Sequence, residues 1–272
     1  MSGQSRLLPA REEGRARLLR GFAVQGRVLH ALFIYELQTR FGRNSLGFIW
    51  MFLEPLLLAL AIASVRFATP NAAQEAVSPF LFAVTGYGPY LAFRSIVSRA
   101  AGAFRSAQRF LYHSNVTLFD VMVARTLLEA MAVLGVLTLV VGGAAFWAGF
   151  APNNVLILLA GIALIFLFAH GVAMMVASAA ALSETVERLV NPLLYLTIPI
   201  SGALFAMHPL PPTFRNLFLL NPQVHIHEMV RDGMFGDIIP AYWDLGYILA
   251  FVIGFNLLGF LAMRAVRPKL EF

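Results

Sequence analysis

Six stretches of this sequence are apolar enough and long enough to be expected to cross a lipid bilayer. A spanning α-helix needs about 20 predominantly apolar residues, because it rises only about 1.5 Å per residue through the hydrocarbon core. The fifth stretch is the shortest and contains Pro199, so we expect a kinked helix there. The pattern predicts an all-α polytopic membrane protein whose six transmembrane helices cover residues 48–67, 79–97, 121–149, 155–181, 192–207 and 243–263.

Polar segments divide the rest of the chain. Residues 1–47 form an N-terminal segment, residues 48–266 the membrane domain and residues 267–272 a short tail. Within the membrane domain, the longer polar segments are residues 98–118 and residues 208–242. No repeat of 20–50 residues is present, so we expect a single membrane domain.

The distribution of arginine predicts the orientation of the chain. With both termini placed in the cytoplasm, fifteen of the twenty basic residues fall on the cytoplasmic side. Only Arg66, Arg215 and Arg231 then fall on or near the outer side. Cytoplasmic loops of membrane proteins carry an excess of Lys and Arg, so the count favours two cytoplasmic termini.

Composition agrees with a membrane protein and excludes several kinds of site. The chain is 59% hydrophobic and 12% charged, whereas a soluble domain is about 25% charged. Because there is no cysteine, neither a disulfide framework nor a thiolate metal site is available. The one lysine, Lys269, lies near the C-terminus, so the chain has no ATP-binding P-loop of its own. We expect no cofactor or metal on this chain and no nucleic-acid partner.

The N-terminal segment contains an amphipathic stretch. Such a helix is expected to lie along the inner leaflet, either as a membrane anchor or as a gate that moves during a transport cycle. Its apolar face comprises Leu18, Phe22, Leu29, Phe33, Leu37 and Phe41.

The inner loop of residues 98–118 is too polar to cross the membrane and rich in Arg and aromatic residues, which protein interfaces favour. A short helix in it would present an interaction surface; the alternative is a charged loop that obeys the positive-inside rule. The residues concerned are Arg99, Phe104, Arg105, Arg109, Phe110 and Leu111.

Ionisable residues within the expected spans are costly and therefore informative. Arg125 and Glu129 lie four residues apart, which suits an intrahelical ion pair. Glu54 precedes Pro55 in the first span, where a kink with a polar lining is plausible. A proton-coupled secondary transporter would use such acids, although it would want more of them and often an inverted repeat.

The second span is irregular and aromatic. Tyr87, Tyr90 and Arg94 lie near three helix-weakening residues, two glycines and Pro89. Tyrosines that face a channel would stack on sugar rings; ordinary packing is the alternative.

The outer segment of residues 208–242 contains an apolar stretch too short to span, which predicts a re-entrant or interfacial helical hairpin. His225 and His227 do not share a helical face, which argues against a zinc site with Glu228. The spacing of His227 and Asp232 also matches a lipid acyltransferase pattern, which leaves a membrane-bound transferase as an alternative.

Two motifs carry a resemblance to a known family. The first is Glu36-Leu-x-Thr-Arg40-Phe-x-x-x-x-Leu46-Gly47-x-x-Trp50-x-x-x-x-Pro55, and the second is Asn221-Pro222-x5-Glu228-x2-Arg231-x-Gly233. The chain resembles type-2 ABC transporter permeases and, more narrowly, the KpsM-type permeases of bacterial capsule export. The six predicted spans, the two cytoplasmic ends and the length of 272 residues agree with those of this family.

The resemblance implies a permease in the bacterial inner membrane that forms a channel as a homodimer among membrane lipids. Two copies of a separate cytoplasmic ABC ATPase would bind ATP and magnesium, and a periplasmic adaptor and an outer-membrane exporter would continue the path. The substrate would be a lipid-linked acidic polysaccharide. O-antigen, teichoic acid, lipids or small molecules are the alternative substrates within the superfamily.

The resemblance also implies roles for particular segments. The 98–118 loop would hold the coupling helix that docks on the ATPase, with Phe104, Arg105, Arg109, Phe110 and Leu111 at the contact. Arg suits phosphate and carboxylate groups, so a set of inner arginines would receive the anionic substrate. The expected substrate and channel residues are Arg40, Arg43, Trp50, Tyr87, Tyr90, Arg94, Arg99 and Tyr195, and the expected periplasmic gate residues are Asn221, Pro222, Glu228 and Arg231.

Overall fold

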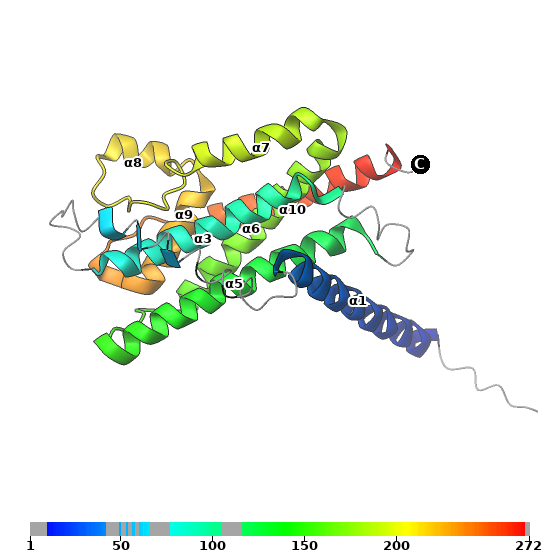
Figure 1. Ribbon diagram of the computed structural model, residues 1–272, viewed down its shortest axis with the longest axis horizontal. Helices are drawn as coiled ribbons and strands as arrows, with labels where there is room; N and C mark the ends of the chain where they lie inside the picture. The colour runs from blue at the N-terminus through cyan, green and yellow to red at the C-terminus, as the bar shows by residue number, and fades with distance from the viewer. Residues whose placement is uncertain are drawn as a thin grey trace, which may run out of the picture.

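The computed structural model describes residues 10–41, 77–104 and 116–269, together with isolated helical positions between residues 49 and 65. Helices make up the secondary structure of these residues (Figure 1). The α-helices are α1 (Ala10–Phe41), α3 (Pro79–Ala100), α5 (Leu118–Ala148), α6 (Val155–Leu182), α7 (Glu184–Thr197), α8 (Pro212–Phe218), α9 (Pro222–Phe235) and α10 (Leu245–Val266). Two short 3-10 helices are η2 (Gly236–Ile238) and η3 (Arg267–Lys269).

Helix α6 lies at the centre of the bundle, where it packs against α10, α9 and α3. It approaches α10 closely at Gly171, where a Cβ atom would lie 2.8 Å from the backbone of Phe255 and Asn256. The side chain of Asn256 donates a hydrogen bond across the same contact to the carbonyl of Leu167, at 2.8 Å. Small residues allow such close helix packing in membrane proteins, where interhelical polar contacts also contribute.

Three described helices are long and apolar enough to cross a membrane, and they match the third, fourth and sixth predicted spans. The second predicted span is also a helix, α3, whose residues are mostly buried inside the bundle. The first predicted span, residues 48–67, falls mostly outside the described residues. The three apolar helices cover Leu118–Trp147, Val155–Leu182 and Leu245–Val266.

The prediction of a single kinked helix over residues 192–207 is wrong. Helix α7 begins at Glu184 and ends at Thr197, and turns occupy residues 198–207. The helix stops two residues before Pro199 because proline has no N–H group to donate to the carbonyl of Tyr195, which instead accepts from the backbone N–H of Ile198 at 3.3 Å. Pro199 therefore ends the helix rather than bending it.

The segment of residues 208–242 contains two α-helices that differ in burial. Helix α8 is exposed along its length, whereas α9 is buried along almost its whole length, against α6 and α3. Asn221 joins them and caps α9 by accepting a hydrogen bond from the backbone N–H of Gln223 at 3.0 Å. Both helices lie at the end of the molecule opposite the C-terminus (Figure 1).

Helix α1 projects from the bundle and contacts it through α5 (Figure 1). Leu32 of α1 is buried in a small apolar cluster with Val121 and Ala124 of α5. Residues 21–27 of α1 are exposed, with 74% of Phe22 accessible. Of the expected apolar face, Leu29 and Leu37 are half-buried, so that face is only partly covered within this chain.

Candidate functional site

A network of buried ion pairs joins α1, α3 and α5. The guanidinium of Arg125 on α5 donates to the carboxylate of Glu36 on α1 at 2.8 Å and to the backbone carbonyl of Arg99 on α3 at 3.2 Å. On the next turn of α5, Glu129 accepts a hydrogen bond from Ser95 at 2.8 Å and lies 3.5 Å from Arg99. Both carboxylates are buried. Buried charges of this kind are tolerated only when they are paired and hydrogen-bonded.

A second polar link between α1 and α5 lies about three turns away along α1. The side-chain amide of Gln25 on α1 donates to the carboxylate of Asp120. The other oxygen of Asp120 accepts from the backbone N–H of Thr117 at 2.8 Å, and the Thr117 hydroxyl accepts from the Asp120 N–H at 3.3 Å. This capping box starts α5. One carboxylate therefore both starts the helix and holds α1 against it.

The face between α3 and α7 contains the aromatic residues that were expected to line a channel. Tyr90 is fully buried, and its hydroxyl donates to the carbonyl of Leu194 at 2.7 Å. Tyr87 is buried beside it, with the two ring centroids 6.0 Å apart. Arg94 instead stacks on Tyr195 of α7, 4.0 Å from the ring centroid, and 55% of Tyr195 is exposed. Of these three tyrosines, Tyr195 is therefore the exposed one, whereas Tyr87 and Tyr90 are buried within the bundle.

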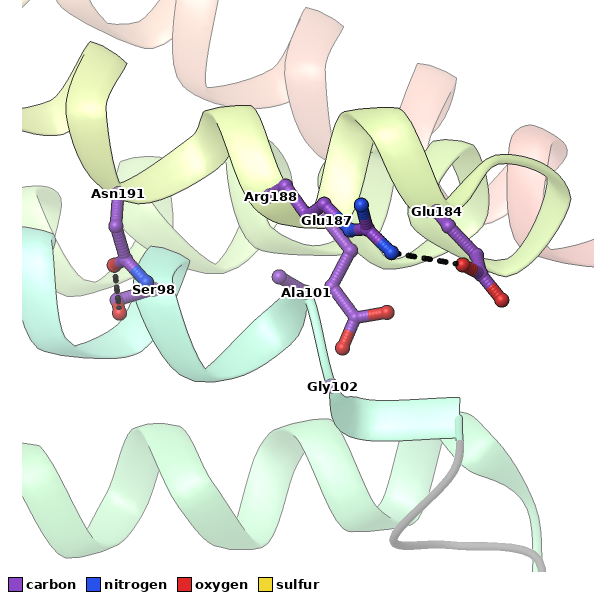
Figure 2. A pocket seen from close by; sticks show the side chains of 7 residues that line it. All are labelled: Ser98, Ala101, Gly102, Glu184, Glu187, Arg188 and Asn191. Atoms are coloured by element: carbon purple, nitrogen blue, oxygen red, sulfur yellow. Dashed lines mark hydrogen bonds and ion pairs between the residues drawn. The ribbon is translucent and has the colours of Figure 1, made fainter.

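A polar pocket of about 380 Å³ lies where the end of α3 meets the start of α7 (Figure 2). Ser98 donates a hydrogen bond across it to Asn191 at 2.5 Å. Along the edge, Arg188 and Glu184 form an exposed ion pair at 3.4 Å. The carboxylate of Glu187 points toward Gly102, at the beginning of the expected coupling loop (Figure 2). The pocket thus places polar and charged side chains beside that loop.

At the other end of α3, an ion pair is buried completely within the bundle. Glu228 and Arg231 of α9 lie 3.2 Å apart and have no exposed surface. The Glu228 carboxylate also accepts from the backbone N–H groups of Met207 and Tyr242, each at 3.2 Å. It therefore fastens α9 both to the turn region after α7 and to the segment before α10.

Arg231 ties α9 to α3 as well. Its guanidinium donates to the carbonyl of Ala203 at 2.8 Å and lies 4.5 Å from the ring centroid of Phe82. At Gly86 of α3, a Cβ atom would lie 2.1 Å from that carbonyl oxygen and 2.9 Å from the guanidinium. Glycine is therefore required at this position for α3 to approach the cluster.

The histidines of α9 are engaged with the backbone and face different neighbours. His225 donates from Nε2 to the carbonyl of Leu219 at 2.8 Å and accepts at Nδ1 from the N–H of Asp244 at 3.0 Å. His227 donates from Nδ1 to the carbonyl of Gln223 at 2.9 Å. Among the described residues, no group of three or more His, Cys, Asp or Glu side chains is arranged to hold a metal ion.

The sequence matches the family model described as ABC-2 type transporter over residues 27–235. The chain belongs to the ABC-2 type transporter family. This confirms the resemblance that the two motifs carry. The matched region of this ABC-2 type transporter runs from within α1 to the end of α9, so it includes the ion-pair network, the α3–α7 face and the buried Glu228–Arg231 pair.

Similarity to curated relatives extends along almost the whole ABC-2 type transporter. It is 31% identical over 258 residues to the capsule polysaccharide export inner-membrane protein BexB of Haemophilus influenzae, covering 92% of this chain and 94% of that protein. It is 32% identical over 257 residues to the capsule polysaccharide export inner-membrane protein CtrC of Neisseria meningitidis serogroup A, with coverage of 92% and 94%. It is 28% identical over 255 residues to the polysialic acid transport protein KpsM of Escherichia coli, with coverage of 92% and 96%.

The predicted site residues of the transporter fall into separate groups. Arg94 and Tyr195 meet across α3 and α7, and Arg99 belongs to the ion-pair network. Asn221 and Pro222 start α9, where the side-chain amide of Asn221 also donates to the carbonyl of Ile200 at 2.9 Å. Phe104 is partly buried in the short helical stretch after α3, and Arg40 lies on α1, where only its backbone is described. Predictions that fall outside the described residues concern Arg43, Trp50, Arg105, Arg109, Phe110 and Leu111.

Sequence reasoning missed the side chains that connect α1 to the bundle. Glu36 stood in a motif without an assigned contact, and Gln25 and Asp120 were given no role. A carboxylate at Glu36 inside an otherwise apolar helical face was the available signal, because a buried acid requires a cationic partner. Its partner, Arg125, lies 89 positions away along the chain and could not be identified from spacing.

Proposed function

We propose that this chain is the membrane-spanning permease subunit of an ATP-driven exporter that moves a lipid-linked acidic polysaccharide of the capsular type across the inner membrane. Two copies form the channel, both termini face the cytoplasm, and a separate ABC ATPase hydrolyses ATP. The observation that carries the proposal is the similarity, over 92% of the chain, to proteins named for capsule polysaccharide export at the inner membrane.

The α3–α7 face supports a polysaccharide as the substrate. Tyr195 offers an exposed ring, and Arg94 lies over it. An aromatic ring packs well against the apolar face of a sugar, while the planar guanidinium binds carboxylate or phosphate oxygens in pairs. One aromatic–arginine pair therefore provides both interactions that an acidic sugar requires. The neighbouring Leu193 and Leu196 are exposed too, which suits a helix that faces a second copy of the chain or lipid.

The pocket at the end of α3 supports docking of an ATPase at that end. Its lining combines Glu184, Glu187, Ser98 and Asn191 beside the first residues of the expected coupling loop. Polar and charged rims are typical of protein interfaces that form between separately folded subunits. In this proposal, the neighbouring loop of residues 98–118 makes the main contact.

The experiment that tests the proposed function is purification of the tagged full-length chain from its native membrane in mild detergent. We expect a P-loop protein to co-purify and the complex to hydrolyse ATP. In cells that lack the chain, polysaccharide is expected to accumulate in the cytoplasm, and the wild-type chain should restore its appearance at the cell surface. Purification of the chain without any ATP-hydrolysing partner would contradict the proposal and favour a proton-coupled transporter.

A further inference from the structure

We infer that Tyr90 is a positioning residue for substrate binding: its hydroxyl holds the peptide group that precedes Tyr195 and thereby sets the geometry of the Arg94–Tyr195 pair. This inference rests on the proposed function, in which that pair binds an acidic sugar. Tyr90 has no exposed surface, so it cannot itself stack on a sugar. The structure places it behind the proposed sugar surface rather than on it.

Helix α7, which carries Tyr195, is joined to the bundle through few buried residues. Two of its fourteen residues, Val190 and Leu194, are buried. Pro192 within the helix also removes one backbone hydrogen bond, since proline has no N–H group. The contacts that α7 makes with side chains of α3 therefore contribute to where it lies.

These contacts follow one line along the two helices. Tyr90, Arg94 and Ser98 are spaced by four residues, so they lie on one face of α3. Ser98 donates to Asn191 of α7 at 2.5 Å (Figure 2), and Arg94 lies 4.0 Å from the ring centroid of Tyr195. Asn191 and Tyr195 are again four residues apart. Tyr90 makes the next contact along this line, at the C-terminal end of α7.

The end of α7 presents a carbonyl that Tyr90 binds. The backbone N–H of Ile198 donates to the carbonyl of Tyr195 at 3.3 Å rather than to that of Leu194. The Leu194 carbonyl accepts instead from the hydroxyls of Tyr90 and Thr197, each at 2.7 Å. The last carbonyls of a helix need such donors, because the helix does not provide them. Since Thr197 belongs to α7, Tyr90 is the donor that ties this carbonyl to α3.

The bond from Tyr90 fixes the backbone next to the exposed ring. The carbonyl of Leu194 and the N–H of Tyr195 belong to one planar peptide group. Holding the carbonyl therefore holds the plane from which the Tyr195 side chain projects. The ring of Tyr90 is held in turn by Tyr87 and Phe93, with centroids 6.0 and 6.3 Å away. One buried hydroxyl thus positions Tyr195 against the guanidinium that lies one turn along α3.

The experiment uses the full-length chain with its co-purified ATPase in lipid nanodiscs. The probe is the acidic polysaccharide extracted from the native cells and labelled with a fluorophore, and its Kd is measured by fluorescence anisotropy. Tyr90→Phe keeps the buried ring, and Thr197 still donates to the Leu194 carbonyl, so this variant should fold. Tyr247→Phe is the matched control, because the Tyr247 hydroxyl also donates to a backbone carbonyl, that of Leu220 at 2.9 Å.

We expect Tyr90→Phe to weaken binding about 2- to 10-fold, as loss of one hydrogen bond would, and Tyr247→Phe to leave binding unchanged. Tyr195→Ala should weaken binding more. Adding Tyr90→Phe to Tyr195→Ala should then have no further effect, because a positioning residue acts through the group that it positions. A general structural role would instead weaken binding by the same factor in both backgrounds.

Three results would overturn the inference and leave the proposed function standing. They are unchanged binding in Tyr90→Phe, equal losses in the two backgrounds, and failure of Tyr90→Phe to assemble with the ATPase while Tyr247→Phe assembles. Wild-type binding in Tyr195→Ala would also overturn it, because the pair would then not bind the sugar. Absence of polysaccharide binding by the wild-type complex, or of an ATPase partner, would overturn the proposed function and this inference with it.

Discussion

Replacing Arg231 by methionine is expected to destabilise the folded chain by about 3–5 kcal/mol, the usual cost of breaking a buried ion pair by removing one partner. In the wild-type chain, the carboxylate of Glu228 is fully buried and accepts from the guanidinium and from two backbone N–H groups. In Arg231→Met it stays buried with the two backbone donors alone. The guanidinium's bond to the carbonyl of Ala203 is lost as well.

The chain provides a matched control in the exposed pair Glu184–Arg188. This pair also lies within one helix, but its side chains are 72% and 81% exposed. Such surface pairs contribute only about 0.3–0.5 kcal/mol, so Arg188→Met should hardly change stability. The comparison holds the residue types constant and varies burial.

The assay is the free energy of unfolding in mild-detergent micelles, measured as loss of helical circular dichroism with increasing SDS. Arg231→Met should unfold at much lower SDS than wild type, and Arg188→Met close to wild type. The double variant Glu228→Gln/Arg231→Met should be more stable than Arg231→Met, because no uncompensated charge is then buried. Equal losses for Arg231→Met and Arg188→Met would refute the reasoning.

Three further predictions concern packing, the substrate face and pH. Gly171→Ala should lower the free energy of unfolding by about 1–3 kcal/mol, because the new Cβ would meet backbone atoms of α10 at 2.8 Å. Gly254→Ala is the control, since a Cβ there would have no atom within 4 Å, and it should not destabilise the fold. Unfolding in SDS measures both variants. Tyr195→Ala should lower polysaccharide export more than Leu193→Ala, an exposed neighbour, while ATPase co-purification stays unchanged; equal effects would contradict a stacking role. Burial and the Arg231 cation lower the pKa of His227 from 6.5 to about 4, so the folded chain keeps it neutral and loses stability as pH falls from 6.5 toward 4. The melting temperature of His227→Gln should depend less on pH over this range than that of the wild-type chain. An equal pH dependence in the two proteins would contradict the prediction.

The apolar helices were predictable from the sequence because their signal is local. A predominantly apolar run long enough to span defines each of α5, α6 and α10, and the structure confirms these helices within a few residues. The end of α7 was predicted incorrectly, although Pro199 marked the position. Hydropathy continues through residues 198–207, and only the backbone chemistry of proline separates a break from a kink.

The polar contacts were less predictable because they join residues that are distant in the sequence. The spacing of Arg125 and Glu129 predicts an intrahelical pair, whereas the structure shows bonds to other helices: Arg125 donates to Glu36 of α1, and Glu129 accepts from Ser95 of α3. Likewise, the motif that contains Glu228 suggested a gate, and sequence alone could not indicate that this residue is completely buried. Helical periodicity identifies a face; it does not identify the helix that covers that face.

Helix α3 connects the ion-pair network around Arg125 with the buried Glu228–Arg231 pair. With 22 residues it is about 33 Å long, which is close to the thickness of a bilayer core. In its last turn the carbonyl of Arg99 accepts from Arg125 of α5, and its first turns meet Arg231 through Phe82 and Gly86. The charged groups of these two contacts, Arg125 and Arg231, are both largely buried, so breaking either contact would leave a buried charge without part of its hydrogen bonding, which is costly. Between the two clusters, Arg94 stacks on the exposed ring of Tyr195, so α3 also carries the arginine of the pair that we propose as the sugar-binding surface.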